Sequence, residues 1–190
     1  MSFFLPDLAL VKERFFVRES AKRELATVAQ RMQTTSKRAI FAVHRDDLET
    51  ALALLEETHE AESLGEALCR QEASLAHEGI WRAAREEQLE AELLVAILLE
   101  REIALPTNDP ERVIGACSDV VGELARVLVR DVTQGDLARV ERLKSVAQDL
   151  LGFLLEFDAT GGARQKVDQA RQHLRKIEDV AYDLAVRRGV

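Results

Sequence analysis

The stretch of sequence that decides the fold is Arg85-Glu86-Glu87-Gln88-Leu89-Glu90-Ala91-Glu92, which leads into the apolar run Leu93-Leu94-Val95-Ala96-Ile97-Leu98-Leu99. A helix with so many apolar residues is usually buried on most of its sides. Helical spacing nevertheless places Glu87 and Glu90 on the same face as Leu94. Carboxylates on an apolar face cost free energy unless a partner, a proton or a metal ion compensates their charge. The sequence therefore raises the question of what these two acids are for.

The composition predicts an all-α protein. The chain has 190 residues, enough for one domain with a substantial core, and only 3 Pro and 9 Gly. Strong helix formers, chiefly Ala, Leu, Glu and Arg, dominate it. We expect a single helical-bundle domain over residues 1–190, with six or seven helices. Because no Gly or Pro lies between Pro6 and Gly65, the first helix is expected to be very long.

The expected helices follow from apolar periodicity and from turn-forming residues. They cover about 7–45, 47–73, 76–104, 110–130, 136–157 and 163–188. Asp46 and Asp47 are candidate caps for the second helix. Asp109 followed by Pro110 is the clearest helix start in the chain.

The charge is distributed unevenly. The net charge of −8 argues against nucleic acid as a partner, but residues 1–45 carry nine basic and four acidic side chains and the remainder is strongly acidic. A basic segment on an acidic body suits local phosphate binding. A solvated helix face is the alternative interpretation, and composition alone favours it.

Location follows from what the sequence lacks. Cys69 and Cys117 lie far apart without the spacing of a zinc site or a disulfide framework, as expected in a reducing compartment. The first residues have no signal-peptide pattern. The longest apolar run, residues 93–99, is far shorter than the roughly 20 residues of a membrane span. We expect a soluble cytoplasmic protein that does not associate with membranes.

A second pair of acids, Asp119 and Glu123, lies four residues apart in the fourth expected helix. If that helix packs antiparallel to the third, all four carboxylates could converge. They could not share a site while ionised without cations. Oxygen ligands suit Mg²⁺ or Mn²⁺, and such clusters serve metal-assisted cleavage of phosphodiesters. Because acids are abundant, the spacing alone favours a structural ion-pair network with arginines such as Arg126.

Other chemistry is poorly supported. Only one Glu-x-x-His occurs, at residues 56–59, whereas a di-iron bundle needs two. Zinc-protease, P-loop, dinucleotide-binding and Gly-x-Ser-x-Gly motifs are lacking. His77, Trp81 and Arg82 form a group that would stack on a base or pair with a phosphate. A surface His and Arg beside a core Trp is an equally good interpretation.

Five short segments occur in the order in which they occur in a known family. They are Ser36-Lys37-Arg38-Ala39-Ile40-Phe41-Ala42-Val43-His44-Arg45, Glu87-Gln88-Leu89-Glu90-Ala91, Ser118-Asp119-Val120-Val121-Gly122-Glu123-Leu124, Thr133-Gln134-Gly135-Asp136, and Lys176-Ile177-Glu178-Asp179-Val180-Ala181-Tyr182-Asp183-Leu184-Ala185-Val186-Arg187. Together they resemble the translin superfamily, and in particular its Trax (translin-associated factor X) branch. The likeness extends over about residues 20–190.

The resemblance implies an all-α subunit of a hollow octamer that binds short or single-stranded RNA, or single-stranded DNA, inside its shell. In Trax, acids at the positions of Glu87, Glu90, Asp119 and Glu123 bind a divalent metal and cleave RNA. The translin branch lacks these acids and only binds. The presence of all four here favours the catalytic branch, with Mg²⁺ or Mn²⁺ as the cofactor.

The chain also departs from the family pattern. The basic patch before the third helix is reduced to His77, Trp81 and Arg82, and the long insertion of animal Trax shrinks to residues 107–109. These features suggest a compact, prokaryotic, self-assembling form.

Three hypotheses follow from the sequence. The first is a Mg²⁺-dependent endoribonuclease in which the four acids hold the metal. Nucleic-acid-binding residues are then expected to be Lys37, Arg38, Arg45, His77 and Arg82. The second is a non-catalytic nucleic-acid-binding shell, and the third is a purely structural helical oligomer.

Overall fold

The structure of the chain, a computed structural model, describes residues 7–187 and contains only helices within them. The elements are α1 (Leu8–His44), α2 (Leu48–Gln71), the 3₁₀ helix η1 (Ala73–His77), α3 (Gly79–Leu99), α4 (Pro110–Gln134), α5 (Leu137–Leu155) and α6 (Gly161–Arg187). The predicted all-α class and the very long first helix are confirmed. Within the described residues, no helix is both long and apolar enough to cross a membrane.

Aspartates begin three of the helices, because each accepts a hydrogen bond from a backbone N–H that the first turn leaves unpaired. Asp47 accepts from the Thr50 N–H at 3.0 Å, and Asp109 caps α4 in the same way, immediately before Pro110. Asp136 caps α5. The predicted start of α4 is confirmed, and Asp47 rather than Asp46 caps α2.

The third helix is shorter than the sequence predicts. Residues 73–77 form η1 instead of the first turn of α3, because the Glu72 side chain binds the N–H and the hydroxyl of Ser74. α3 ends at Leu99, where Glu100 adopts a left-handed conformation with φ 54°. The following residues up to Asp109 contain no helix.

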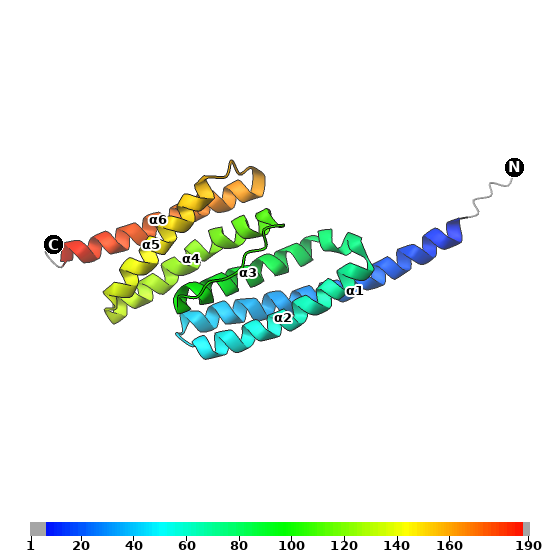
Figure 1. Cartoon of the computed structure of the whole chain (residues 1–190), viewed down its shortest axis with the longest axis horizontal. Helices are drawn as coiled ribbons and strands as arrows, with labels where there is room; N and C mark the ends of the chain where they lie inside the picture. Colours follow the sequence, from blue (N-terminus) through cyan, green and yellow to red (C-terminus); the bar gives the residue numbers. More distant parts are fainter. Residues whose placement is uncertain (1–6, 188–190) are drawn as a thin grey trace.

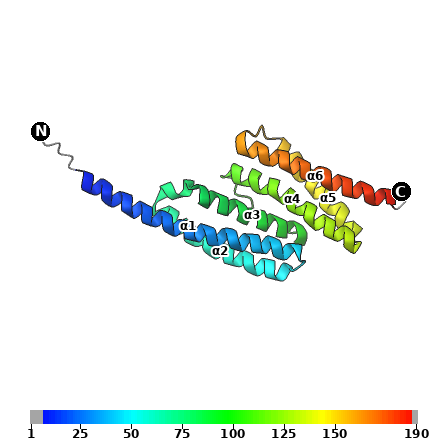
Figure 2. The same cartoon turned by 180° about the vertical axis from the view of Figure 1, so that it is seen from behind.

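The helices form two three-helix units, α1–α2–α3 and α4–α5–α6, which meet where α3 packs against α4 (Figures 1 and 2). The connection from residue 100 to 109 runs back along α3, so α4 starts near the beginning of α3 (Figure 1). Arg112 Nε donates to the Arg85 carbonyl at 2.8 Å, and further along both helices Glu90 and Glu123 line one cavity. The two helices therefore run parallel, and not antiparallel as in the arrangement considered from the sequence.

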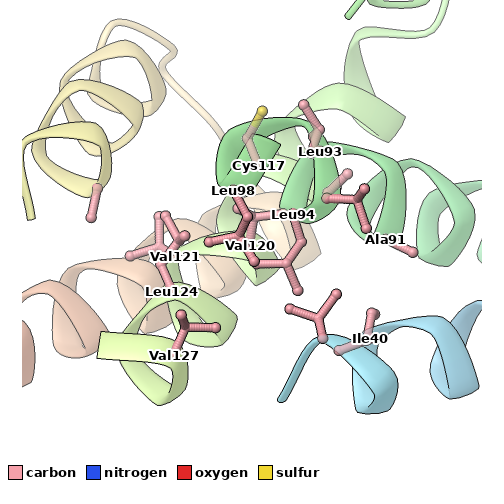
Figure 3. Packing of buried hydrophobic residues seen from close by; sticks show 14 of the residues in the cluster. Ile40, Ala91, Leu93, Leu94, Leu98, Cys117, Val120, Val121, Leu124 and Val127 are labelled. Carbon is pink, nitrogen blue, oxygen red and sulfur yellow. The ribbon is translucent and has the colours of Figure 1, made fainter. Parts of the chain in front are cut away.

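The apolar run of α3 is anchored in the main core. Figure 3 shows Leu94 and Leu98 packed against Val120, Val121 and Leu124 of α4. These side chains are fully or almost fully buried, and each stabilises the fold by about 1.5–3 kcal/mol. The same packing fixes the position of the acids in the middle of α3.

A smaller core lies between α1, α2, η1 and α3 around Trp81, which is only 2% exposed. Its ring lies against Gly65 of α2, where any Cβ atom would overlap it. Trp81 is therefore a core residue and does not stack on a base. Gly65 does not interrupt α2 but makes room for this ring.

Candidate metal and nucleic-acid site

The four predicted acids lie on both sides of the contact between α3 and α4. Glu87 and Glu90 come from α3, and Asp119 and Glu123 come from α4. Glu87, Glu90 and Glu123 line a cavity of about 250 Å³, and Asp119 joins Glu90 and Glu123 in an adjoining cavity of about 160 Å³. The structure thus brings together the four residues that the sequence singles out, although through parallel helices. We call this region the acid seam.

Glu90 is the most buried member of the acid seam, with 7% of its surface exposed. Burial, reinforced by the charges of Asp119, Glu87 and Glu123, raises its pKa to about 8. Among residues 7–187 it has no hydrogen-bond or ion-pair partner. Its carboxyl group is therefore mostly protonated at neutral pH unless a cation comes close.

Asp119 is paired with a lysine that the sequence does not indicate. Lys166 Nζ, from α6, lies 2.5 Å from Asp119 Oδ2 and 2.5 Å from Glu86 Oε1. Burial alone lowers the pKa of Lys166, but its hydrogen bonds to the two carboxylates outweigh this, and the pKa is raised. An ammonium group thus neutralises Asp119 and Glu86 in this structure.

The other two acids also have cationic neighbours. Glu123 Oε2 lies 2.5 Å from His44 Nε2, and Arg126 Nη1 donates to Glu123 Oε1 at 3.0 Å. Lys37 Nζ lies 3.6 Å from Glu87. Within the described chain, Glu90 alone of the four acids has no partner of opposite charge.

Two glycines on α4 leave space for side chains that lie next to the acid seam. A Cβ atom at Gly115 would overlap the Glu86 carboxylate, and one at Gly122 would lie 3.2 Å from the ring of His173. The small residues of α4 therefore make room for groups from α3 and α6. Burial, aided by the charges of Lys176 and Arg126, lowers the pKa of His173, so its ring is neutral at pH 7.

The predicted nucleic-acid-binding residues lie at different distances from the seam. Lys37 lines its larger cavity, and Arg45 lies over the ring of Phe41, which lines that cavity too. Arg82 is exposed beside a separate cavity that it shares with Glu86. Arg38 and His77 are exposed and line neither cavity of the seam.

Four residues at the acid seam are not among the site residues predicted from the sequence. Glu86 lies four residues before Glu90, so helical spacing would have indicated it. Lys166 is 47 residues from Asp119 and carries no local signal. His44 and Phe41 lie in the first family-like segment, but nothing in its pattern points to the acids of α3 and α4.

The donor set fits a hard divalent cation in chemistry and in charge. All four ligands would be carboxylate oxygens, as Mg²⁺ and Mn²⁺ prefer, and a nearby cation would favour ionisation of the unpaired Glu90 at neutral pH. Within residues 7–187, however, no three acidic, His or Cys side chains already surround one point as a metal cage. Asp119 and Glu123 are turned toward Lys166 and His44 instead.

Comparison with known proteins supports the resemblance found in the sequence. The model of the translin family matches residues 99–188. Chicken (Gallus gallus) translin is 34% identical over 80 residues, which make up 42% of this chain and 35% of that protein. The matched segment thus spans about a third of this curated relative.

Solved structures match nearly the whole chain. The structure of the AfC3PO–duplex RNA complex has a TM-score of 0.84 and 26% identity, over 95% of this chain and 97% of that one. The crystal structure of AfC3PO (TM-score 0.87, 24% identity, 96% and 99% covered) and that of apo-NeC3PO (0.83, 21%, 94% and 97%) share the fold. Together with the match to the family model over residues 99–188, these likenesses support membership of the translin superfamily.

Proposed function

We propose that the chain is a Trax-like, metal-dependent endoribonuclease that cleaves short or single-stranded RNA inside a homo-oligomer. One observation carries this proposal, namely the buried, unpaired carboxyl group of Glu90 among three further acids. A purely structural cluster would gain no stability from a buried carboxyl group that has no partner. The similarity to a protein solved with duplex RNA supports RNA as the substrate.

In this proposal Glu87, Glu90, Asp119 and Glu123 hold Mg²⁺ or Mn²⁺. When bound, such a cation acts as a Lewis acid for the phosphodiester and for the attacking water. The exposed Arg126, which lies beside Glu123, and Lys37, beside Glu87, bind the phosphates on either side of the scissile bond.

Two side chains next to the acids affect how the acids bind a cation. His44 holds Glu123 in its present orientation, whereas Lys166 pairs with Asp119 and competes with an incoming cation for its carboxylate. Arg38, Arg45, His77 and Arg82 extend the basic surface along α1 and across to the start of α3, where they bind the RNA backbone away from the acids.

Assembly is supported by the first turns of α1, which extend beyond the bundle (Figure 1). Exposed apolar side chains there, each 50–65% exposed, are Leu8, Leu10, Val11, Phe15, Phe16 and Val17. A patch of this kind on a helix is typical of a subunit contact. We propose a homo-oligomer, with the octamer of the family as the favoured form, located in the cytoplasm.

The alternative is a non-catalytic shell that binds RNA or single-stranded DNA. It is favoured by the cations that already neutralise three of the four acids. This alternative predicts salt-sensitive nucleic-acid binding without cleavage by the pure protein.

A cleavage assay on short single-stranded RNA separates the two functions. We expect cleavage by the wild type with Mg²⁺, none with EDTA, and a loss of at least about 100-fold in Glu90→Gln and Asp119→Asn. Glu141→Gln is the matched control, because Glu141 is an exposed acid on α5 whose partner is Lys144. Cleavage that persists in both seam variants contradicts the nuclease proposal. RNA binding without any cleavage favours the shell.

A further inference from the structure

Phe41 is an exposed aromatic residue on a helix whose neighbouring side chains are buried. It is 60% exposed, whereas Ile40 and Ala42 on either side are 7% and 3% exposed. Exposing a large ring forgoes the stabilisation that its burial would contribute. The position is fixed by α1, which ends three residues later at His44, so the ring is held on a rigid element.

Phe41 lies at the acid seam. Its side chain lines the same cavity of about 250 Å³ as Glu87, Glu90 and Glu123. A group resting on the ring is therefore adjacent to the carboxylates that the proposed function assigns to catalysis.

Cationic side chains lie over the ring or line the same cavity. The Arg45 guanidinium carbon lies 5.3 Å from the ring centroid, and Lys37 and Arg126 line the same cavity. An aromatic face among cationic groups suits a ligand that combines a flat π-system with negative charge. A nucleotide has this combination, with its base for the ring and its phosphates for the cations.

We propose that Phe41 is a stacking platform for an unpaired nucleobase, which places the adjoining phosphate over the acid seam. This inference rests on the proposed function and specifies its substrate, since a base inside a duplex is already stacked on both faces and is not free to stack on a protein ring. Arg45 beside the ring contacts the same nucleotide.

Other aromatic residues of the described chain are placed differently. Phe153 of α5 and Phe157 just after that helix meet edge to face, with ring centroids 5.0 Å apart, and Phe15 and Phe16 of α1 meet edge to face at 5.7 Å. Trp81 is buried in the smaller core. A subunit contact through Phe41 is the competing explanation of its exposure, and the experiment distinguishes it.

The test is a double comparison of RNA binding by the full chain in EDTA, so that cleavage does not interfere. One comparison replaces the ring, with Phe41→Leu, Phe41→Trp and the control Phe153→Leu. The other removes the bases, with a short single-stranded RNA set against an abasic ribose-phosphate oligomer of equal length. We expect Phe41→Leu to weaken RNA binding on the order of tenfold, and Phe41→Trp and Phe153→Leu to retain it.

The affinity for the abasic oligomer distinguishes stacking on a base from other roles of Phe41. Stacking predicts that wild type and Phe41→Leu bind it equally well, because the lost contact is with a base. Equal loss of affinity for both oligomers, unchanged RNA binding by Phe41→Leu, or an altered oligomer size on gel filtration overturns the inference. Failure of the nuclease proposal looks different, because the wild type then binds RNA with the same base dependence but does not cleave it when Mg²⁺ is restored.

Discussion

Helix α4 contributes to two clusters of buried charged residues, which differ in their ratio of acidic to basic side chains. Near its C-terminal end, Asp131 is fully buried and lies 3.1 Å from Arg130 Nη2 and 3.1 Å from Arg139 Nε, although the latter N–H is not aligned for a hydrogen bond. Asp46 lies 3.2 Å from Arg130 on its outer side. Here each acid has an arginine nearby, and the acidic and basic charges are balanced.

The acid seam, two to three helical turns earlier on α4, has more carboxylates than cations. Glu90 is left without a partner, and its pKa rises to about 8 because of burial and the neighbouring acids. At Asp131 no such excess exists. A buried acid as such is therefore compatible with a purely structural role, whereas the uncompensated group of acids supports the proposal of a cation site.

The largest expected effect concerns the balanced cluster. Asp131→Ala leaves two arginines without their buried partner, and we expect a loss of about 3–5 kcal/mol in the free energy of unfolding. Urea denaturation measures it. A loss below about 1 kcal/mol would show that Asp131 is not the centre of a structural network.

In the acid seam, replacing a buried acid should stabilise the protein, in contrast to the loss of stability expected for Asp131→Ala. The folded-state pKa of Glu90 is raised from 4.5 to about 8, so between these pH values the unfolded chain releases a proton that the folded chain keeps. Stability contributed by the protonated carboxyl therefore falls as pH rises from about 4.5 to 8 and levels off above. Without divalent ions at pH 8.5, Glu90→Gln should be more stable than wild type by on the order of 2 kcal/mol.

The pH profile of unfolding sharpens this expectation. The difference between wild type and Glu90→Gln should vanish near pH 4.5, where both side chains are neutral, and Glu141→Gln should show no such dependence. A Glu90→Gln variant less stable than wild type at pH 8.5 would mean that an ionised Glu90 is already compensated.

A smaller effect is expected at Lys166. Lys166→Met removes the ammonium group next to Asp119 and Glu86 and keeps the length of the side chain. Because Asp119 is then free for an added cation, we expect Mn²⁺ to bind several-fold more tightly, as measured by electron paramagnetic resonance. Lys144→Met on α5 is the control. Weaker Mn²⁺ binding by Lys166→Met would indicate that Lys166 holds Asp119 in the orientation that a metal needs.

The smallest effect is expected at the contact of α4 with α6. Gly122→Ala places a Cβ atom 3.2 Å from the His173 ring, which is tight but leaves the partly exposed ring room to shift. We expect a change in the free energy of unfolding of less than about 1 kcal/mol. A loss of several kcal/mol would show that this contact is rigid.

Much of this arrangement could be predicted from local sequence patterns. The helix starts at Asp47, Asp109 and Asp136 follow from capping chemistry, and the four seam acids follow from helical spacing and the family-like segments. The parallel course of α3 and α4 could not, because the connecting segment from residue 100 to 109 contains no regular pattern that fixes its direction. A short link predicts antiparallel neighbours, but this one is extended and runs back along α3.

Long-range partners were beyond the reach of the sequence for a different reason. Lys166 and Glu86 meet across 80 residues, and His44 and Glu123 across 79. Nothing in the local spacing of either partner encodes the other. The exposure of Phe41 was also hidden, because a Phe between Ile40 and Ala42 suggests a core position as readily as a surface one.

A Mn²⁺ titration at pH 8 of wild type beside Glu90→Gln tests most directly whether the acid seam is a metal site. We predict one bound ion per chain in the wild type, with release of about half a proton because the pKa of Glu90 is about 8, and weakening of binding by at least about tenfold in Glu90→Gln. Equal Mn²⁺ binding by the two proteins, or none by the wild type, would contradict it.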